Sequence, residues 1–358
     1  MKAAFYSPYL ESLGGGERYV LTLIAALNQQ GWDTVLFWDG QPITDQVKNK
    51  FHLDISKTQY LPNVFQRGSL IKRIQYLREY DLIFFVSDGS LPFLFGKRNI
   101  VHLQVPFKGI NGDSLINQIK NKTVTNFVVN SEFTKNVVDQ EYGLNSQVIY
   151  PPVEINEIKP GIKQNSILFA ARFSNLLQQK CHHVLIHAFK RLYDTGVHDY
   201  QLWLAGSTEV GSDGGLLEQL KTMAAGYPIK FYTDIDWQAL RQLYIEAKFF
   251  WSAVGYEADE ENEPEKCEHF GISLVEAMAA GCVPIVINKG GYREIIINER
   301  SGYLWNDLEQ LLNITTNLFN DQKQVAKISQ GAQKRAQDFS KDRFVNEFMR
   351  LINSSALN

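Results

Sequence analysis

Short apolar segments alternate with amphipathic segments along almost the whole chain, and no other feature limits the fold so strongly. In the first half, apolar segments of strand length span 3–6, 34–38, 82–86, 99–103, 124–129 and 148–150. In the second half, they span 166–170, 202–205, 229–232, 249–252 and 283–287. Segments with helical spacing, such as 18–29, 182–193 and 237–247, separate them. Strands that alternate with helices in this way pair in parallel, so the sequence predicts an α/β protein built on parallel sheets.

The length of the chain and a proline-rich stretch near its middle predict two domains. A chain of 358 residues is too long for one ordinary hydrophobic core. Three prolines stiffen the polar stretch around 151–160, as in a linker between domains. We therefore place one domain at 1–155 and a second at 156–335, with a final helix in 336–358.

Composition excludes several classes of protein. A formal charge of −3 argues against a dedicated nucleic-acid binder. The three cysteines are too few and too scattered for a disulfide framework or a zinc cluster, and they fit a reducing compartment. No apolar stretch reaches the length of a membrane span, and the N-terminus reads as a first strand rather than a signal peptide. We therefore expect a cytoplasmic protein.

The segment Glu268–Gly281 places two carboxylates around the start of a predicted helix. Ser273 and Glu276 have the spacing of a capping box, which predicts a helix from about Ser273 to Ala280. The free N–H groups at such a helix start favour an anion, and the carboxylates could accept hydrogen bonds from sugar hydroxyls. A simpler alternative is that Glu276 only caps the helix and Glu268 belongs to a solvated acidic run.

Other polar residues follow predicted strands of the first domain, where doubly wound sheets bind ligands. The glycines 14–16 would let backbone approach a ligand, or they form a plain flexible loop. His102 stands at the end of a strand, where a histidine can act on a substrate or serve only as a structural hydrogen-bonding group. Asn130 or Ser131 is expected to cap the next helix.

Two cations follow the first strand of the second domain. Arg172 and Lys180 could hold a diphosphate and stabilise it as a leaving group, or they could be exposed basic residues. Nearby, His183 and His187 share a helix face, but no carboxylate pattern accompanies them, so we predict no metal site.

Motifs in both halves of the chain share one order with a known family. They are Gly14-Gly-Gly-Glu-Arg, Val129-Asn-Ser-Glu-Phe-Thr-Lys, Ile149-Tyr-Pro-Pro-Val, the pair Arg172 and Lys180, and Glu268-His-Phe-Gly-Ile-Ser-Leu-Val-Glu276 with Gly290, Gly291 and Glu294. This set resembles the GT-B glycosyltransferases of family 4, and 264–271 is most similar to the branch of dolichol-oligosaccharide mannosyltransferases and bacterial envelope relatives. The resemblance implies two Rossmann-like domains facing across a cleft, with the last helix crossing back to the first domain.

The resemblance also implies roles for individual residues. Glu268 and the backbone of Phe270, Gly271 and Ile272 would contact the sugar, and Glu276 the ribose. Arg172 and Lys180 would contact the diphosphate, Gly15 and Gly16 would face a phosphate, and His102 would lie beside the reacting carbon. Gly206 and Ser207 match a family position that lines the donor site.

The function implied is retaining transfer of a hexose from a nucleoside diphosphate sugar, either GDP-mannose or a UDP-sugar, without an essential metal or other cofactor. The acceptor would be a glycan or glycolipid hydroxyl in envelope or exopolysaccharide synthesis. Two alternatives remain open, a nucleotide-sugar epimerase and a noncatalytic nucleotide-sugar binding module on the same fold.

A basic segment suggests a separate property. Arg67, Lys72, Arg73 and Arg78 lie among apolar residues at helical spacing, so 65–78 could contact anionic lipid on the inner face of a membrane. The alternative is an ordinary amphipathic surface helix.

Overall fold

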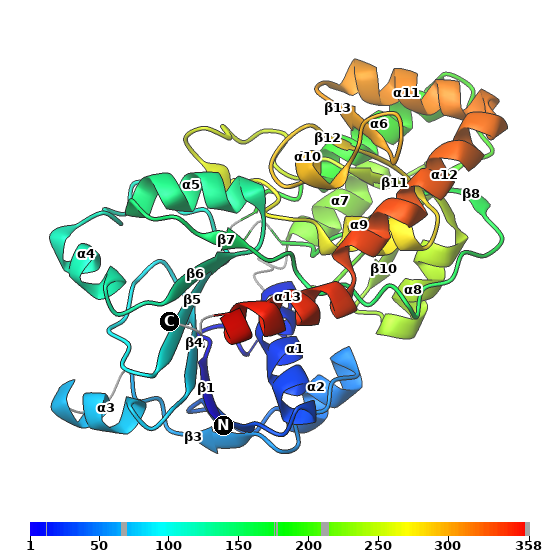
Figure 1. Cartoon of the computed structure of the whole chain (residues 1–358). Helices are drawn as coiled ribbons and strands as arrows, with labels where there is room; N and C mark the ends of the chain where they lie inside the picture. The colour runs from blue at the N-terminus through cyan, green and yellow to red at the C-terminus, as the bar shows by residue number, and fades with distance from the viewer. Residues whose placement is uncertain (12, 66–69, 175, 177, 209–214, 355–358) are drawn as a thin grey trace. The chain divides into compact units, whose positions relative to one another are not determined.

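The computed structural model describes residues 1–11, 13–65, 70–174, 176, 178–208 and 215–354. It divides the chain into two compact units (Figure 1). Unit 1 consists of Met1–Pro152 with the C-terminal segment from Lys341, and unit 2 is Val153–Ser340. The first change of unit thus falls three residues before the expected boundary at 155. Unit 1 resumes five residues after the expected start of the last segment at 336.

Unit 1 is built on a seven-stranded parallel sheet with the order β3-β2-β1-β4-β5-β6-β7. Its strands are β1 (Lys2–Tyr6), β2 (Asp33–Phe37), β3 (Gln59–Leu61), β4 (Leu82–Ser87), β5 (Arg98–Leu103), β6 (Asn126–Val129) and β7 (Gln147–Val148). Every residue of β4 is buried, as expected for a central strand covered on both faces.

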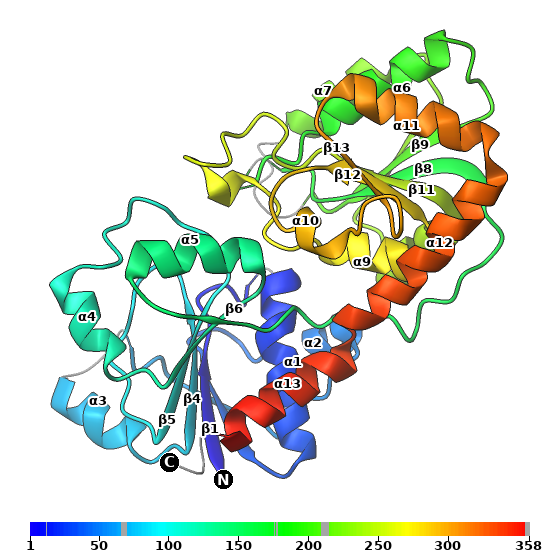
Figure 2. The same ribbon diagram turned by 45° about the horizontal axis from the view of Figure 1, so that its top comes forward.

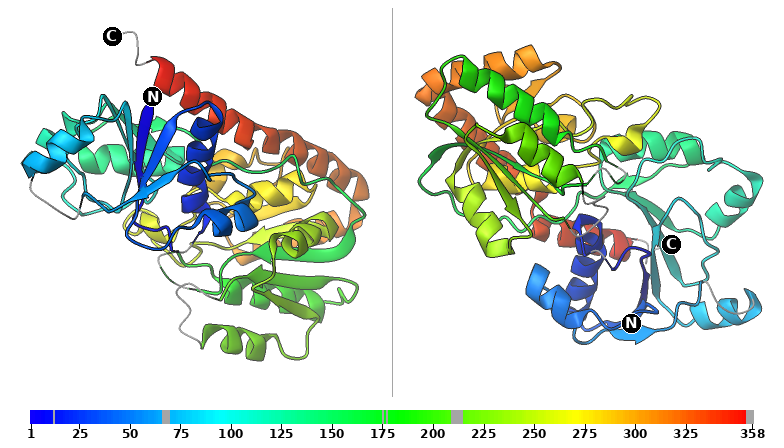
Figure 3. Two further views of the ribbon diagram at one scale, coloured as in Figure 1. Left: turned by 90° about the horizontal axis from the view of Figure 1, so that it is seen from below. Right: turned by 180° about the vertical axis from the view of Figure 1, so that it is seen from behind.

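Helices cover both faces of this sheet. They are α1 (Gly15–Gln29), α2 (Thr44–Phe51), α3 (Leu70–Leu77), α4 (Leu115–Asn121), α5 (Glu132–Tyr142) and α13 (Lys341–Ser354). α1, α2 and α13 contribute to the core on one face, whereas α3 and α5 border the core on the other. α13, red in Figures 1 and 3, lies beside α1, and its buried Phe344 and Phe348 meet the ring of Tyr19 edge-on. Both phenylalanines belong to the apolar face that α13 buries in unit 1.

Unit 2 has a six-stranded parallel sheet with the order β10-β9-β8-β11-β12-β13. Its strands are β8 (Gln164–Ala170), β9 (Gln201–Gly206), β10 (Ile229–Thr233), β11 (Ala247–Ser252), β12 (Val283–Ile287) and β13 (Tyr303–Trp305). Its helices are α6 (His182–Asp194), α7 (Leu216–Ala224), α8 (Trp237–Glu246), α9 (Ile272–Ala279), α10 (Tyr292–Ile295), α11 (Leu308–Asn320) and α12 (Gln322–Ala336). α6, α7 and α11 cover one face of the sheet, and α9 and α12 lie together on the other (Figure 2).

The strand orders confirm the predicted doubly wound α/β architecture in both units. Each order reverses beside its first strand, between β1 and β4 in unit 1 and between β8 and β11 in unit 2. Connections that leave two such neighbouring strands diverge to opposite sides, which opens a binding crevice at their carboxyl ends. We therefore expect a ligand site in the segments that follow these four strands.

Two strands were missed by the sequence pattern. β3 and β13 have three residues each, at one outer edge of their sheets, and neither forms an apolar run long enough to stand out. Because β3 was missed, His102 lies on the fifth strand of unit 1 rather than the fourth, and Leu103 ends that strand. The expected cap at Ser131 is confirmed, since its hydroxyl accepts a hydrogen bond from the Thr134 N–H at 3.0 Å.

Candidate active site

Two connections at the crevice of unit 2 carry most of the predicted site residues. Residues 171–181 follow β8, and residues 253–271 follow the neighbouring strand β11. Backbone hydrogen bonds join these connections, from Gln179 N–H to Lys266 O at 3.1 Å and from Gly255 N–H to Gln179 O at 2.8 Å. The fold thus brings Arg172 and Lys180 together with Glu268, which lies 88 residues after Lys180 in the sequence.

Lys180, Gln178 and Glu268 form a nearly buried polar cluster. The Lys180 ammonium donates to Gln178 Oε1 at 2.6 Å and to Glu268 Oε2 at 3.3 Å. The amide of Gln178 in turn donates to Glu268 Oε1 at 3.3 Å. Only 9% of the Lys180 side chain and 15% of the Glu268 side chain are exposed. The predicted sugar contact and the predicted diphosphate contact are therefore ion-paired partners in the structure.

The environment of Glu268 keeps its carboxylate ionised. Burial is the largest single influence and favours the neutral acid, but the charge of Lys180, the charge of His269 and the hydrogen bonds from Lys180 and Gln178 together outweigh it. The pKa of Glu268 consequently lies below its ordinary value. The site therefore holds an ionised carboxylate directly beside the amine of Lys180.

Arg172 adds a second positive charge to this edge. Its side chain is half-buried, and it has no hydrogen bond or ion pair with another residue that the structure describes. It lies near enough to Lys180 to disfavour the charged form of that lysine and lower its pKa, although burial is the larger cause. Two cations and one carboxylate leave one unbalanced positive charge, which makes the crevice favourable for an anion.

Gly206 positions the backbone that carries Arg172. A Cβ atom at Gly206 would lie 1.9 Å from the carbonyl oxygen of Ala171, so only glycine fits there. The same strand end is tied to the loop by Ala171 N–H to Ala205 O at 2.9 Å and by Phe173 N–H to Ser207 O at 3.0 Å. Gly206 and Ser207 thus lie at the predicted donor site, and these hydrogen bonds already give their backbone a structural role.

Close backbone packing fixes Glu268. The Gly291 N–H donates to Glu268 O at 2.8 Å, and a Cβ at Gly290 would lie 2.3 Å from the same oxygen. The preceding Lys289 donates to the carbonyl oxygens of Gly255, Tyr256 and Ala258 at 3.0, 2.9 and 2.7 Å. These hydrogen bonds hold the connection 253–271 in place. The connection is irregular except for a 3₁₀ turn at Pro264–Lys266.

The expected capping box at the start of α9 is wrong. The helix begins at Ile272, with Gly271 as its N-cap at φ 120°, and Ser273 already lies inside the first turn. A side chain at Gly271 would be strained by that backbone conformation, and its Cβ would lie 2.8 Å from the ring of Tyr292. Glu276 is buried, and its carboxylate accepts a hydrogen bond from the Tyr244 hydroxyl at 3.1 Å. This hydrogen bond joins Glu276 to the neighbouring helix α8.

In unit 1, Gly15 and Gly16 form the first turn of α1 after the N-cap Gly14. Gly15 is exposed, whereas Gly16 faces the side chain of Gln104. The buried carboxylate of Glu17 accepts a hydrogen bond from the Gly14 N–H. This helix start therefore already has one internal carboxylate, which the sequence reasoning did not consider.

His102 is completely buried in the core of unit 1. Its ring stacks on Tyr19 at a centroid distance of 4.0 Å, and Nδ1 lies 3.1 Å from the carbonyl oxygen of Val128. Burial lowers the pKa of His102 to about 3, so the ring is neutral. Nε2 is buried without a hydrogen-bond partner among the described residues. The contact with Val128 fits the structural alternative, and a role beside the reacting carbon stays a prediction.

Sequence reasoning missed three contributors to the site. Gln178 gave no signal beyond its position two residues before Lys180. Lys289 precedes the glycine pair that was noted, and a lysine beside an acidic loop could have suggested the contact. Tyr244 lies on α8, and nothing in its local sequence connects it with Glu276. Asn175, from the same loop as Gln178, lies outside the described residues.

The histidines near Lys180 have separate environments. His182 is buried against Phe173, whereas His183 Nε2 lies 3.0 Å from Glu257 Oε1. Among the residues that the structure describes, no three His, Cys, Asp or Glu side chains group so that they could hold a metal ion.

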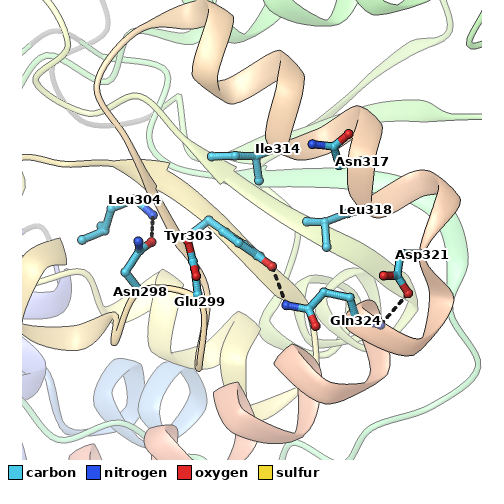
Figure 4. Close-up of a pocket in the computed structure, with 9 residues that line it drawn as sticks. All are labelled: Asn298, Glu299, Tyr303, Leu304, Ile314, Asn317, Leu318, Asp321 and Gln324. Atoms are coloured by element: carbon cyan, nitrogen blue, oxygen red, sulfur yellow. Dashed lines mark hydrogen bonds between the residues drawn. The ribbon is translucent and has the colours of Figure 1, made fainter.

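A pocket of about 340 Å³ lies elsewhere in unit 2, between β13 and helices α11 and α12 (Figure 4). Tyr303 accepts a hydrogen bond there from the Gln324 amide at 2.9 Å. None of the predicted site residues lines this pocket, so it is distinct from the crevice at β8 and β11.

Comparison with known proteins places the chain in a family. The model for glycosyl transferases group 1 matches residues 153–335, just over half of the chain. The chain belongs to this family. The matched segment covers nearly all of unit 2, including the whole crevice described above.

Curated relatives include two proteins of Dictyostelium discoideum. The chain is 27% identical to a GDP-Man:Man(3)GlcNAc(2)-PP-Dol alpha-1,2-mannosyltransferase, over 64% of this chain and 48% of that protein. It is 25% identical to the alpha-1,3/1,6-mannosyltransferase ALG2, over 59% of this chain and 56% of that protein. The chain thus spans about half the length of the curated relatives it matches.

Solved glycosyltransferases share the fold. A glycosyltransferase from Rickettsia africae matches with a TM-score of 0.77 at 16% identity, covering 100% of this chain and 99% of that one. HepE from Anabaena, solved in complex with UDP-glucose, matches with a TM-score of 0.73 at 20% identity, covering 99% and 100%. The two parallel-sheet units therefore have the GT-B fold that the sequence predicted.

Proposed function

We propose that this chain is a glycosyltransferase that moves a hexose from a nucleoside diphosphate sugar to an acceptor hydroxyl. The observation that carries the proposal is the cluster of Lys180, Gln178 and Glu268 beside Arg172 at the crevice of unit 2. It combines a surplus positive charge, which suits a diphosphate, with a fixed carboxylate, which suits sugar hydroxyls.

Each group has a chemical role in this proposal. Arg172 is free to take the diphosphate through its planar fork of donors, and Lys180 adds a second charge at the edge of the phosphates. Both cations stabilise the negative charge that develops as the bond between the sugar carbon and the diphosphate breaks. Glu268 accepts hydrogen bonds from the sugar and remains ionised because of its paired lysine. Glu276 binds the ribose in the same proposal.

We propose that the reaction retains the configuration of the sugar carbon. The acceptor hydroxyl attacks from the face that the diphosphate leaves, and its proton passes to a departing phosphate oxygen. Arg172 and Lys180 supply the positive charge that a metal ion would otherwise give, so the reaction needs no added metal. The configuration of the product, determined by NMR, tests this: an inverted product would refute retention.

The alternatives make different demands on the site. An epimerase would return an isomerised nucleotide sugar without any acceptor, and a noncatalytic module would bind the donor without releasing nucleoside diphosphate. In this proposal the diphosphate leaves beside the ion pair of Lys180 and Glu268. Charges at that position favour a transferase over an epimerase and over a noncatalytic module.

The mannosyltransferase relatives favour GDP-mannose as donor, and the solved complex of HepE with UDP-glucose supports testing UDP-sugars as well. We propose a glycan or lipid-linked acceptor of the envelope or exopolysaccharide type.

The proposal is tested by measuring nucleoside diphosphate release from a panel of GDP- and UDP-sugars. Glu268→Gln and Arg172→Ala should each lower the rate about 100-fold or more, because each removes a group that acts on the reacting sugar or its leaving group. Glu309→Gln and Arg300→Ala change exposed residues of unit 2 and should have no effect. Rates near wild type in both site variants would refute the assignment.

A further inference from the structure

Helix α4 in unit 1 is unusual because it buries none of its residues. Nine large apolar side chains are exposed among the described residues, and four of them lie between 110 and 119. They are Ile110, Leu115, Ile116 and Ile119, which are exposed by 39, 79, 51 and 54%. A helix of two turns is marginal in water unless it packs an apolar face, so this face lacks the partner that its composition calls for.

The exposed face is held in place by polar contacts. Glu141 on α5 accepts hydrogen bonds from the backbone N–H groups of Gly109 and Ile110 at 3.0 and 2.8 Å. Gly112 packs so closely on Tyr142 that an added Cβ would lie 2.8 Å from its ring. The turn before α4 is therefore anchored, while Ile110 remains 39% exposed. This anchoring presents the apolar residues as a fixed surface.

Lysines flank the apolar residues in the sequence, and they outnumber the two acids nearby, Asp113 and Glu141. Lys108 and Lys122 are exposed, and Lys120 is half-buried with its ammonium 5.9 Å from the centre of the Phe93 ring. The segment 108–123 contains these three lysines and one acid, Asp113, which gives it a charge of +2. Long basic side chains beside an apolar helix face can extend to lipid headgroups while the apolar residues enter the acyl region.

We infer that this face, consisting of Ile110, Leu115, Ile116 and Ile119 with Lys108, Lys120 and Lys122, docks on an anionic lipid bilayer. The apolar side chains supply the insertion, and the lysines supply the attraction to anionic headgroups. A second copy of the chain fits less well, because a symmetric contact through the same face would bring six lysines together. α4 and α3 lie on the side of unit 1 away from α1 and α13 (Figures 1 and 2).

The site differs from the basic segment 65–78 predicted from the sequence. The helix α3 lies within that segment; Arg73 on it is half-buried, and Arg78, which follows it, is exposed. Arg67 and the side chain of Lys72 lie outside the described residues, so lipid contact there stays a prediction. In the part of the chain that the structure describes, no helix is long and apolar enough to cross a bilayer.

The test is flotation of the full chain with phosphatidylcholine vesicles that either contain or lack phosphatidylglycerol. Wild type should float with the anionic vesicles, less at high salt, and much less with neutral ones. The triple variant Leu115→Ser, Ile116→Ser and Ile119→Ser should lose binding on the order of 100-fold. Lys120→Gln with Lys122→Gln should lose binding about 30-fold, since each lysine near an anionic surface contributes about fivefold.

Matched control variants distinguish binding through this surface from nonspecific binding of the protein to vesicles. Ile162→Ser with Ile297→Ser removes exposed aliphatic side chains from unit 2, and Lys48→Gln with Lys50→Gln removes exposed lysines from α2. Both should float as wild type does. The melting temperature of the triple variant should be unchanged, because the three side chains are exposed.

Three results would overturn the inference: no flotation of wild type, flotation of the triple variant at the wild-type level, or a wild-type dimer that the triple variant dissociates. Donor binding in unit 2 does not involve α4, so the triple variant should release nucleoside diphosphate as wild type does. Failure of flotation and failure of the proposed activity are therefore distinguishable.

Discussion

Replacing Lys180 with methionine should destabilise unit 2 strongly, because it leaves the nearly buried carboxyl group of Glu268 without its charged partner. The ammonium and carboxylate are 3.3 Å apart. At that distance and an effective dielectric constant of about 20, two unit charges attract by about 5 kcal/mol. Removing one partner of a buried pair costs about 3–5 kcal/mol, because the remaining charge loses its compensation. We expect Lys180→Met to cost about 3 kcal/mol, since Gln178 still donates to the carboxylate.

A double-mutant cycle measures the pair itself. Lys180→Met, Glu268→Gln and the double variant are compared by urea unfolding, followed by the fluorescence of the tryptophans, of which Trp251 and Trp305 are fully buried in unit 2. The double variant should cost about 2–4 kcal/mol less than the sum of the single variants.

The exposed pair of Lys221 and Glu218 is the matched control. Its charged atoms are 2.7 Å apart, but 46% and 70% of the two side chains are exposed. Water screens such a pair, so its coupling should not exceed about 0.5 kcal/mol. If the buried pair showed a coupling as small as the exposed one, the claim that Lys180 holds Glu268 in the ionised state would be refuted.

Further predictions concern pH, backbone packing, the bridging amide and metal dependence. Burial lowers the pKa of His182 to about 3 from 6.5; unfolding below pH 6.5 therefore takes up a proton, and stability falls as the pH drops from 6.5 towards 3. Between pH 8 and pH 5, the free energy of unfolding measured by urea titration should fall about 2 kcal/mol less in His182→Phe than in wild type. An equal fall in both proteins would contradict a neutral His182 ring in the folded state. Gly290→Ala should lower donor affinity at least about tenfold because its Cβ displaces the Glu268 backbone, while Gly215→Ala, which meets nothing closer than 3.8 Å, should not. Gln178→Leu should lower kcat about tenfold with a smaller effect on KM, and Gln178→Asn should restore part of the rate; equal rates in all three proteins would exclude a positioning role. Incubation with EDTA should leave the rate unchanged, and restoration of a lost rate by a divalent cation would contradict charge stabilisation by Arg172 and Lys180 alone.

The sequence predicted the doubly wound architecture well because buried parallel strands are continuous apolar runs. β4 and β12 are fully buried and were recognised on that basis. β3 and β13 were not, since three residues at the edge of a sheet leave no comparable pattern. Strands long enough to be buried can thus be predicted from the sequence pattern. Short strands at the edge of a sheet cannot, because they depend on tertiary contacts.

The site was predicted in its parts but not in its connections. Arg172, Lys180 and Glu268 were found because each follows a strand at the crevice or belongs to a family motif. The ion pair of Lys180 with Glu268 could not be read from residues 88 positions apart. The capping box failed because Gly271 can adopt a positive φ that starts the helix one residue earlier, a conformation that the spacing of Ser273 does not reveal.

Calorimetric titration with GDP-mannose and UDP-glucose tests the central claim most directly, since it measures donor binding at the crevice without requiring an acceptor. One of the two donors should bind with a single site per chain. Arg172→Ala and Glu268→Gln should each weaken that binding about 10- to 100-fold, and Arg300→Ala should leave it unchanged. A chain that binds neither nucleotide sugar, or site variants that bind as tightly as wild type, would contradict the assignment of a donor site to Arg172, Lys180 and Glu268.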